Sequence, residues 1–90
     1  MKKALISVTG QDACGIIAAV STRLSQLNIN ILDISQTILG GYFTMLMIVD
    51  ITNSTLPFVD LQSDLLAQGE KLGMSITLQR TDIFDAMHRI

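Results

Sequence analysis

A pair of adjacent glycines in the middle of the chain constrains the fold more than any other feature. Gly40 and Gly41 separate two runs rich in apolar and β-branched residues, 30–39 and 42–51. Both glycines can adopt a positive φ without steric cost, as a two-residue hairpin loop requires. We therefore expect the two runs to form antiparallel strands joined by a tight turn.

Alternation along these runs predicts which side chains share a face of the sheet. In the first run, one face is expected to carry Leu32, Ile34, Gln36 and Ile38, and the other Asp33, Ser35 and Thr37. In the second run, one face carries Phe43, Met45, Met47, Val49 and Ile51, and the other Tyr42, Leu46 and Ile48. Both faces of the second run are apolar, so both are expected to be covered.

A strand and a helix are expected before the hairpin. Residues 3–9 predict a strand with Ala4, Ile6 and Val8 on one face and Leu5, Ser7 and Thr9 on the other. A helix is predicted over 14–27, ending where Asn28 takes up a turn conformation. Its sheet-facing stripe comprises Ile16, Ile17, Val20, Leu24 and Leu27, while Ser21, Arg23, Ser25 and Gln26 face water.

A second helix and a last strand follow the hairpin. The turn at 53–55 is expected to cap a helix whose first position is Pro57 and whose end is Gly73. Its apolar stripe comprises Phe58, Leu61, Leu65 and Leu72, with Asp60, Asp64, Gln68 and Lys71 on the outer side. With a strand over 74–81, the order βαββαβ predicts an α+β ferredoxin-like sandwich, a four-stranded antiparallel sheet with both helices on one face.

The opposite face of this sheet is expected to need a partner. Ninety residues make a single domain, 1–90, and 49% of them are hydrophobic. Leu5, Leu46 and Ile48, with Tyr42 nearby, lie on the face that no helix covers, so a homo-oligomeric contact is expected there. The alternative is that the amphipathic tail, 83–90, folds back and covers them.

Charge and cysteine content exclude several classes of function. A net charge of −2 without clusters of Lys or Arg offers no footprint for nucleic acid or an anionic membrane. No apolar run reaches the length of a signal peptide or a transmembrane helix. The single cysteine excludes an internal disulfide, and no spacing suggests a metal site. We therefore expect a cytoplasmic protein without cofactor or metal, bound to neither nucleic acid nor membrane.

The segment between the first strand and the first helix could bind a small anion. Gly10 is expected to let the backbone reverse, and Asp12 to cap the helix. N–H groups at a helix start, together with the helix dipole, attract a carboxylate, and Gly15 has no side chain to block its approach. The alternative is a tight connection between strand and helix with no ligand.

The sequence gives little indication of a catalytic site. Cys14 stands at a helix start, where a thiol can be activated, but the only histidine is His88 in the tail. No two carboxylates are forced together for acid–base chemistry. Binding of a small zwitterion remains, with Asn30 as the candidate to complete the site or, alternatively, as a turn residue bonded to its own backbone.

Two segments together resemble a known family. Residues 10–21 (GQDACGIIAAVS) and 27–36 (LNINILDISQ) are similar to the ACT domain, a small-molecule regulatory module of amino-acid metabolism. The likeness extends over nearly the whole chain, and free-standing bacterial proteins made of a single ACT domain share further segments such as 33–37 and 83–87. The resemblance implies a βαββαβ fold whose subunits associate.

The resemblance also implies where a ligand binds. Amino acids are held between the first loop of one subunit and the start of the second strand of its neighbour. Carried over, the ligand-binding positions are Gln11, Asp12, Ala13, Cys14, Gly15 and Ile16 in the loop, and Asn30 and Ile31 in the strand. Many members have proline where Cys14 stands. Related modules precede the hydrolase that acts on formyltetrahydrofolate, and a pair of them forms the glycine cleavage repressor.

Three hypotheses follow. The first is a non-catalytic regulatory module that binds an amino acid or similar ligand at a subunit interface of a homo-oligomer, expected to be a dimer, and alters the activity of a separate effector protein. The second is an interaction module without a metabolite ligand, related to regulators of the glycine-cleavage-repressor type. The third, an enzyme that uses Cys14, predicts thiol-dependent turnover, which we do not expect.

Overall fold

The computed structural model describes residues 2–11 and 14–81 and confirms the βαββαβ order. The elements are β1 (Lys3–Gln11), α1 (Ile16–Gln26), β2 (Asn30–Leu39), β3 (Tyr42–Asp50), α2 (Phe58–Leu72) and β4 (Met74–Arg80). Asp12, Ala13 and the tail at 83–90, with His88, lie outside the described residues, as do the predictions made for them.

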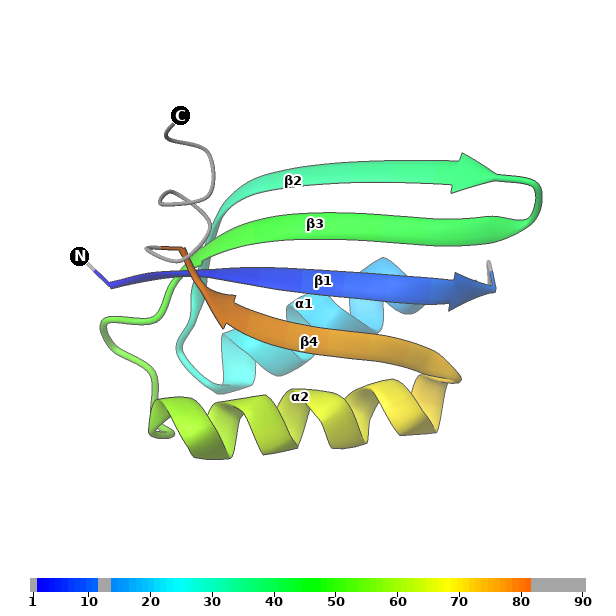
Figure 1. The fold of residues 1–90 in the computed structure, drawn as a ribbon. Helices are drawn as coiled ribbons and strands as arrows, with labels where there is room; N and C mark the ends of the chain where they lie inside the picture. The colour runs from blue at the N-terminus through cyan, green and yellow to red at the C-terminus, as the bar shows by residue number, and fades with distance from the viewer. Residues whose placement is uncertain (1, 12–13, 82–90) are drawn as a thin grey trace.

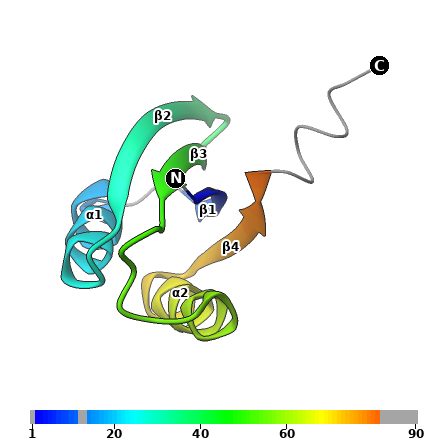
Figure 2. The same ribbon diagram turned by 90° about the vertical axis from the view of Figure 1, so that its left-hand side faces the viewer.

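The four strands form one sheet in the order β2-β3-β1-β4, and every neighbouring pair is antiparallel. Both helices lie on the same side of the sheet; in Figure 1, α1 lies behind the strands and α2 below β4. The view along the strands shows the two layers, with the sheet curved above the helices (Figure 2). The predicted ferredoxin-like sandwich is therefore confirmed, with β2 and β4 as its edge strands.

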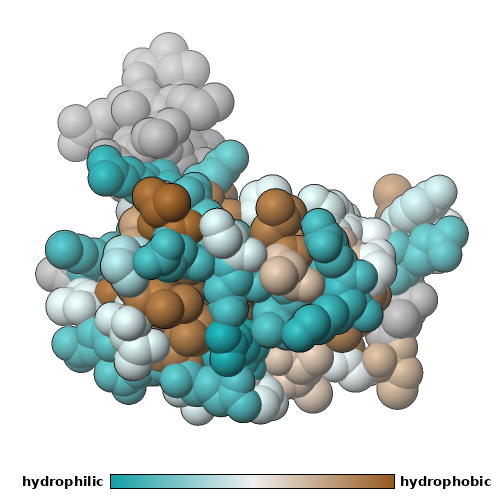
Figure 3. All heavy atoms as spheres, turned by 90° about the horizontal axis from the view of Figure 1, so that it is seen from below, coloured by the Kyte–Doolittle hydropathy of each residue, from teal (hydrophilic) through white to brown (hydrophobic). Residues whose placement is uncertain are grey.

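The outer surface of the helix layer is mixed in polarity. Seen from the side on which α2 lies, hydrophobic residues form separate patches between hydrophilic ones (Figure 3). The exposed large hydrophobic residues of α2 are Val59 and Leu66.

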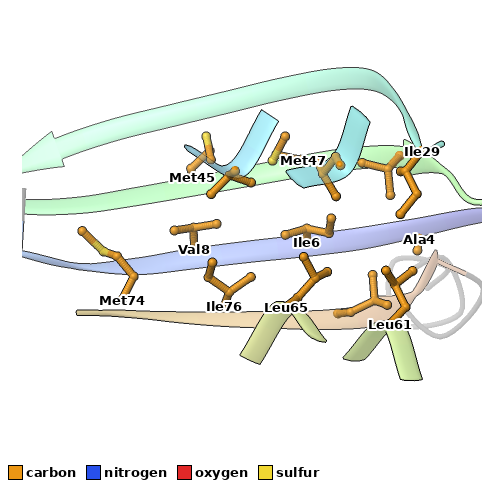
Figure 4. Close-up of a cluster of buried hydrophobic side chains, with 14 of the residues drawn as sticks. Ala4, Ile6, Val8, Ile29, Met45, Met47, Leu61, Leu65, Met74 and Ile76 are labelled. Carbon is orange, nitrogen blue, oxygen red and sulfur yellow. The ribbon is translucent and has the colours of Figure 1, made fainter. Parts of the chain in front are cut away.

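The core fills the space between the sheet and the helices. Ala4, Ile6 and Val8 point from β1 into this layer, as the alternation predicted, and Met45 and Met47 do so from β3 (Figure 4). From the helices, the fully or nearly fully buried residues are Ile16, Val20, Leu24, Leu61 and Leu65. Ile17, predicted in the same stripe, is instead exposed, and it lines a hollow together with Gln36 and Ile38 of β2.

The central hairpin forms as the glycine pair predicted. Gly40 and Gly41 have φ values of 58° and 83°, and β2 has the predicted bounds. The register shifts between Ile31 and Asp33, so Leu32 is the extra residue of a β-bulge. Simple alternation along β2, from which the faces of its side chains were predicted, is therefore interrupted at Leu32.

Gly10 does not reverse the chain as predicted, because β1 continues through it to Gln11. It stands opposite Phe43 on one side and Met74 on the other. A Cβ atom at this position would collide with the sulfur of Met74 and lie 3.2 Å from the carbonyl oxygen of Gly73. Glycine therefore stands where β4 approaches β1 closely, and not at a turn.

The helix boundaries differ from the predicted ones at their starts. α1 begins at Ile16 and not at Cys14, because Gly15 adopts a left-handed conformation with φ 83° at the N-cap position. It ends at Gln26, one residue before the predicted end, and Asn28 takes the predicted turn conformation with φ 62°. α2 begins at Phe58, after Pro57, without a side-chain cap. Ser54, expected to help cap this helix, instead bonds with Leu56 N–H and C=O in the preceding turn.

Arg23 and Asp64, both predicted to face water, join the two helices. Arg23 Nε donates to Asp64 Oδ2 at 2.9 Å, and Nη2 donates to Oδ1. Hydrogen bonding from the guanidinium lowers the pKa of Asp64, against a smaller opposing effect of burial. The outer faces of α1 and α2 are therefore not independent surfaces.

Candidate functional site

The first half of the predicted site lies at the start of α1. Its first helical hydrogen bond runs from Ala19 N–H to Gly15 C=O at 2.9 Å, so the N–H groups of the three preceding residues have no partner within the helix. A hollow of about 210 Å³ adjoins them. Its lining residues are Gly15, Ile16, Ile17, Ala18, Gln36, Ile38 and Phe43.

The second half lies at the other end of α1. A larger hollow, about 510 Å³, is bounded by the last turns of α1, the start of β2 and the end of β3. Its lining residues are Ser21, Ser25, Asn28, Ile29, Asn30, Ile31, Asp50 and Asn53. Most of these are polar, and Asn28 Nδ2 donates to the Asn53 carbonyl oxygen at 3.0 Å, which holds one wall in place. We refer to the two hollows as the Gly15 hollow and the Asn30 hollow.

Asp50 brings a negative charge to the Asn30 hollow. Its Oδ1 accepts hydrogen bonds from Thr52 N–H at 2.9 Å and from Thr52 Oγ1 at 2.5 Å. These two bonds, the side-chain one first, lower the pKa of Asp50 from its ordinary value. The carboxylate is therefore ionised at neutral pH. It stands opposite Asn30 in the β2–β3 pairing.

One chain does not bring the predicted ligand-binding residues together. Gly15 and Ile16 line one hollow and Asn30 and Ile31 the other. Gln11, at the end of β1, pairs with Tyr42, whereas Asn30 pairs with Asp50 at the far end of β3. At about 3.3 Å per residue along β3, these ends are roughly 26 Å apart. Cys14 lies exposed in the turn before α1, and Asp12 and Ala13 are outside the described residues.

The face of the sheet away from the helices carries a third, apolar hollow. Leu5, Leu46 and Ile48 line it together with β2 residues, and its volume is about 170 Å³. Leu5 pairs with Ile48, and the neighbouring Leu46 pairs with Ser7, so the three side chains share this face as predicted. Tyr42 lies further along the same face and is exposed.

Two further findings concern the described residues only. They contain no group of three or more His, Cys, Asp or Glu side chains able to hold a metal ion. Among their helices, none has the length and apolar character needed to cross a bilayer.

With this geometry established, comparison with known proteins identifies the family. A family model described as ACT domain matches residues 2–79. The chain belongs to the ACT domain family. A UPF0237 protein of Bifidobacterium longum is 53% identical over 90 residues, covering 100% of both chains. A UPF0237 protein of Listeria innocua is 48% identical over 88 residues, covering 98% of this ACT domain and 99% of the relative.

Solved structures show the same ACT domain fold. An ACT domain protein from Streptococcus pneumoniae superposes with a TM-score of 0.82 at 41% identity, covering 92% of this chain and 93% of that one. A formyltetrahydrofolate deformylase from Pseudomonas syringae has a TM-score of 0.80 at 20% identity, covering 88% of this chain but 27% of the deformylase. A protein described as a glycine cleavage system transcriptional repressor has a TM-score of 0.73 at 23% identity, covering 88% and 45%. The last two share the fold with this ACT domain.

Sequence reasoning missed Asp50 as part of the Asn30 hollow. Counting outward from the Gly40–Gly41 turn by strict alternation places Asp50 opposite Ile31. The bulge at Leu32 shifts this pairing by one residue and sets Asp50 opposite Asn30 instead. Bulges of this kind have no clear local sequence signal, so the pairing could only be found from the structure.

Proposed function

We propose that this ACT domain is a non-catalytic regulatory module that binds an amino acid, or a similar small zwitterion, between two copies of the chain. ACT domains commonly bind small-molecule ligands and oligomerise. The observation that carries the proposal is the division of the site into two hollows at opposite ends of α1, which only a second copy can unite.

An exposed edge strand supports a pairing that unites them. β2 is at the edge of the sheet, and Ile34 and Ile38 on its helix-side face are both exposed. A two-fold axis that pairs two β2 edges runs the strands in opposite directions. The Asn30 end of one copy then approaches the Ile38 end of the other, where the Gly15 hollow lies. Such a dimer would hold two equivalent sites.

The two hollows have complementary chemistry for a zwitterion. In the Gly15 hollow, N–H groups at the start of α1 and the positive end of its dipole would receive the carboxylate. In the Asn30 hollow, oxygen atoms of polar side chains would receive the ammonium. A ligand bound in this way stabilises the paired arrangement over any other by its differential affinity, and the change in arrangement would alter a separate effector protein.

Replacement of Asn30 by alanine tests the ligand contact. Asn30 is exposed at a strand start, so we expect the fold to persist and the affinity for the amino acid to fall by at least about 10-fold, through loss of hydrogen bonds to a charged group. Titration calorimetry with each of the twenty amino acids measures this. Gln79→Ala, on the opposite edge strand, is the control and should bind as the wild type does. A wild-type protein that binds none of the twenty contradicts the proposal.

Mixing two variants, each weakened in a different half of the site, tests whether the site is shared between copies. Asn30→Ala damages one half, and Gly15→Val damages the other, because a β-branched residue is strained at φ 83°. After subunit exchange, each mixed dimer holds one intact site, so about a quarter of the wild-type number of sites should return. A site contained in one chain would give no recovery.

The apolar hollow on the open sheet face favours a second candidate, an interaction surface that needs no metabolite. Leu46→Asp would place a charge beside Leu5 and Ile48. If another copy covers this face, we expect Leu46→Asp to dissociate the oligomer into smaller species, measured by sedimentation velocity. Asn30→Ala should leave the oligomer assembled. An oligomer unchanged by Leu46→Asp would remove this surface from consideration.

A further inference from the structure

We infer that Asp50 is the counter-charge for the ligand's ammonium group and makes the site selective for ligands with a free amine. The inference rests on the proposed function and adds to it a residue and a selectivity. It starts from the position of Asp50 directly across from Asn30, with both residues lining the same hollow.

Among the described residues that line the Asn30 hollow, eight in number, Asp50 is the only ionisable one. The others offer hydroxyl groups, amides or apolar surface. An ammonium group that leaves water is stabilised by an opposite charge in addition to hydrogen-bond acceptors. Among the described residues that line this hollow, only Asp50 supplies that charge.

The hydrogen bonds from Thr52 to Asp50 occupy only one of the two carboxylate oxygens. Both Thr52 donors bond to Oδ1. A carboxylate accepts at two oxygens, so the bonds that fix its position leave Oδ2 able to accept from a ligand. Thr52 Oγ1 is itself fixed by the backbone N–H of Lys2 at 2.8 Å. These bonds therefore fix the position of the carboxylate before any ligand binds.

The competing explanation is that Asp50 serves only to close the turn that follows β3. Asp50→Asn separates the two roles, because asparagine keeps an Oδ1 acceptor for Thr52 but loses the charge and replaces the Oδ2 acceptor by an NH2 donor. If Asp50 is a turn residue alone, the variant folds and binds as the wild type does. If it is the counter-charge, binding of amines falls while the fold persists.

The test uses the twenty L-amino acids, titrated singly by calorimetry, and their N-acetyl forms, which keep the carboxylate and side chain but lose the ammonium. For each amino acid that binds the wild type, we expect Asp50→Asn to weaken binding by at least about 10-fold. The N-acetyl form should bind the wild type correspondingly weakly. Asp60→Asn, an exposed carboxylate on α2 remote from both hollows, should leave every affinity unchanged.

The outcomes distinguish this inference from the proposed function. Binding of amino acids to Asp50→Asn with wild-type affinity overturns the inference and leaves the proposed function standing. N-acetyl forms that bind the wild type as tightly as the free amino acids overturn it independently of how the variant folds. A wild-type protein that binds none of the twenty overturns the proposed function and this inference with it.

Discussion

Replacement of Leu65 by alanine is expected to lower the free energy of unfolding by about 2–5 kcal/mol. Leu65 is 1% exposed and belongs to the core cluster between α2 and the sheet (Figure 4). Alanine removes apolar surface from that cluster and leaves a cavity, because the neighbouring strand side chains are held by the sheet and cannot collapse into it. Urea denaturation followed by circular dichroism measures the change.

The next residue in the helix provides the matched control. Leu66 is 50% exposed, so Leu66→Ala makes the same chemical change without creating a cavity. We expect an effect within about 0.5 kcal/mol. Equal losses in the two variants would mean that α2 does not present Leu65 to the sheet as described here.

Gly69→Ala is expected to cost about 1–3 kcal/mol, although alanine is the better helix former by about 1 kcal/mol. Gly69 is buried where α2 crosses β4. A Cβ atom there would lie 2.6 Å from the Met74 carbonyl oxygen and 3.1 Å from the Ile76 nitrogen. These are backbone atoms, so the strand itself would have to move away from the helix. The same denaturation measurement applies.

Ala67→Gly is the control for this substitution. Ala67 lies two positions earlier in α2 and is exposed, so glycine there should cost about 1 kcal/mol by helix propensity alone. One variant replaces glycine by alanine and the other alanine by glycine, yet both are expected to lower the free energy of unfolding. A gain in stability for Gly69→Ala would show that helix and strand are not in close contact at this point.

Local sequence patterns predict most of the fold. The glycine pair set the hairpin, and alternation placed Ala4, Ile6 and Val8 correctly, because one face of β1 is buried and a one-residue slip would expose them all. The element order then left few possible arrangements for one sheet and two helices. Such features depend on residues close in sequence, which is why the sequence alone predicts them.

Several of the errors have a different cause, since they involve residues far apart in the chain. Arg23 and Asp64 are 41 positions apart, and nothing near either one indicates the partner that draws it away from water. Glycine in a loop-like segment favours a turn, whereas Gly10 lies within β1 and packs closely against Met74, 64 positions later in the chain. The same holds for the candidate site. Asn30 could be identified as a site residue from the sequence, whereas its neighbour across the strands, Asp50, could not.

The position of α1 between the two hollows has a consequence for the shape of a binding curve. In the proposed dimer, each copy supplies the Gly15 end of its helix to one ligand and the Asn30 end to the other. A helix of eleven residues moves as a rigid rod, so a tilt that tightens one end alters the other. The two ligand sites of a dimer are then coupled through the same two α1 helices, so binding of the first ligand changes the affinity of the other site for the second ligand. Homotropic cooperativity would therefore arise from the architecture itself, without a separate relay of side chains.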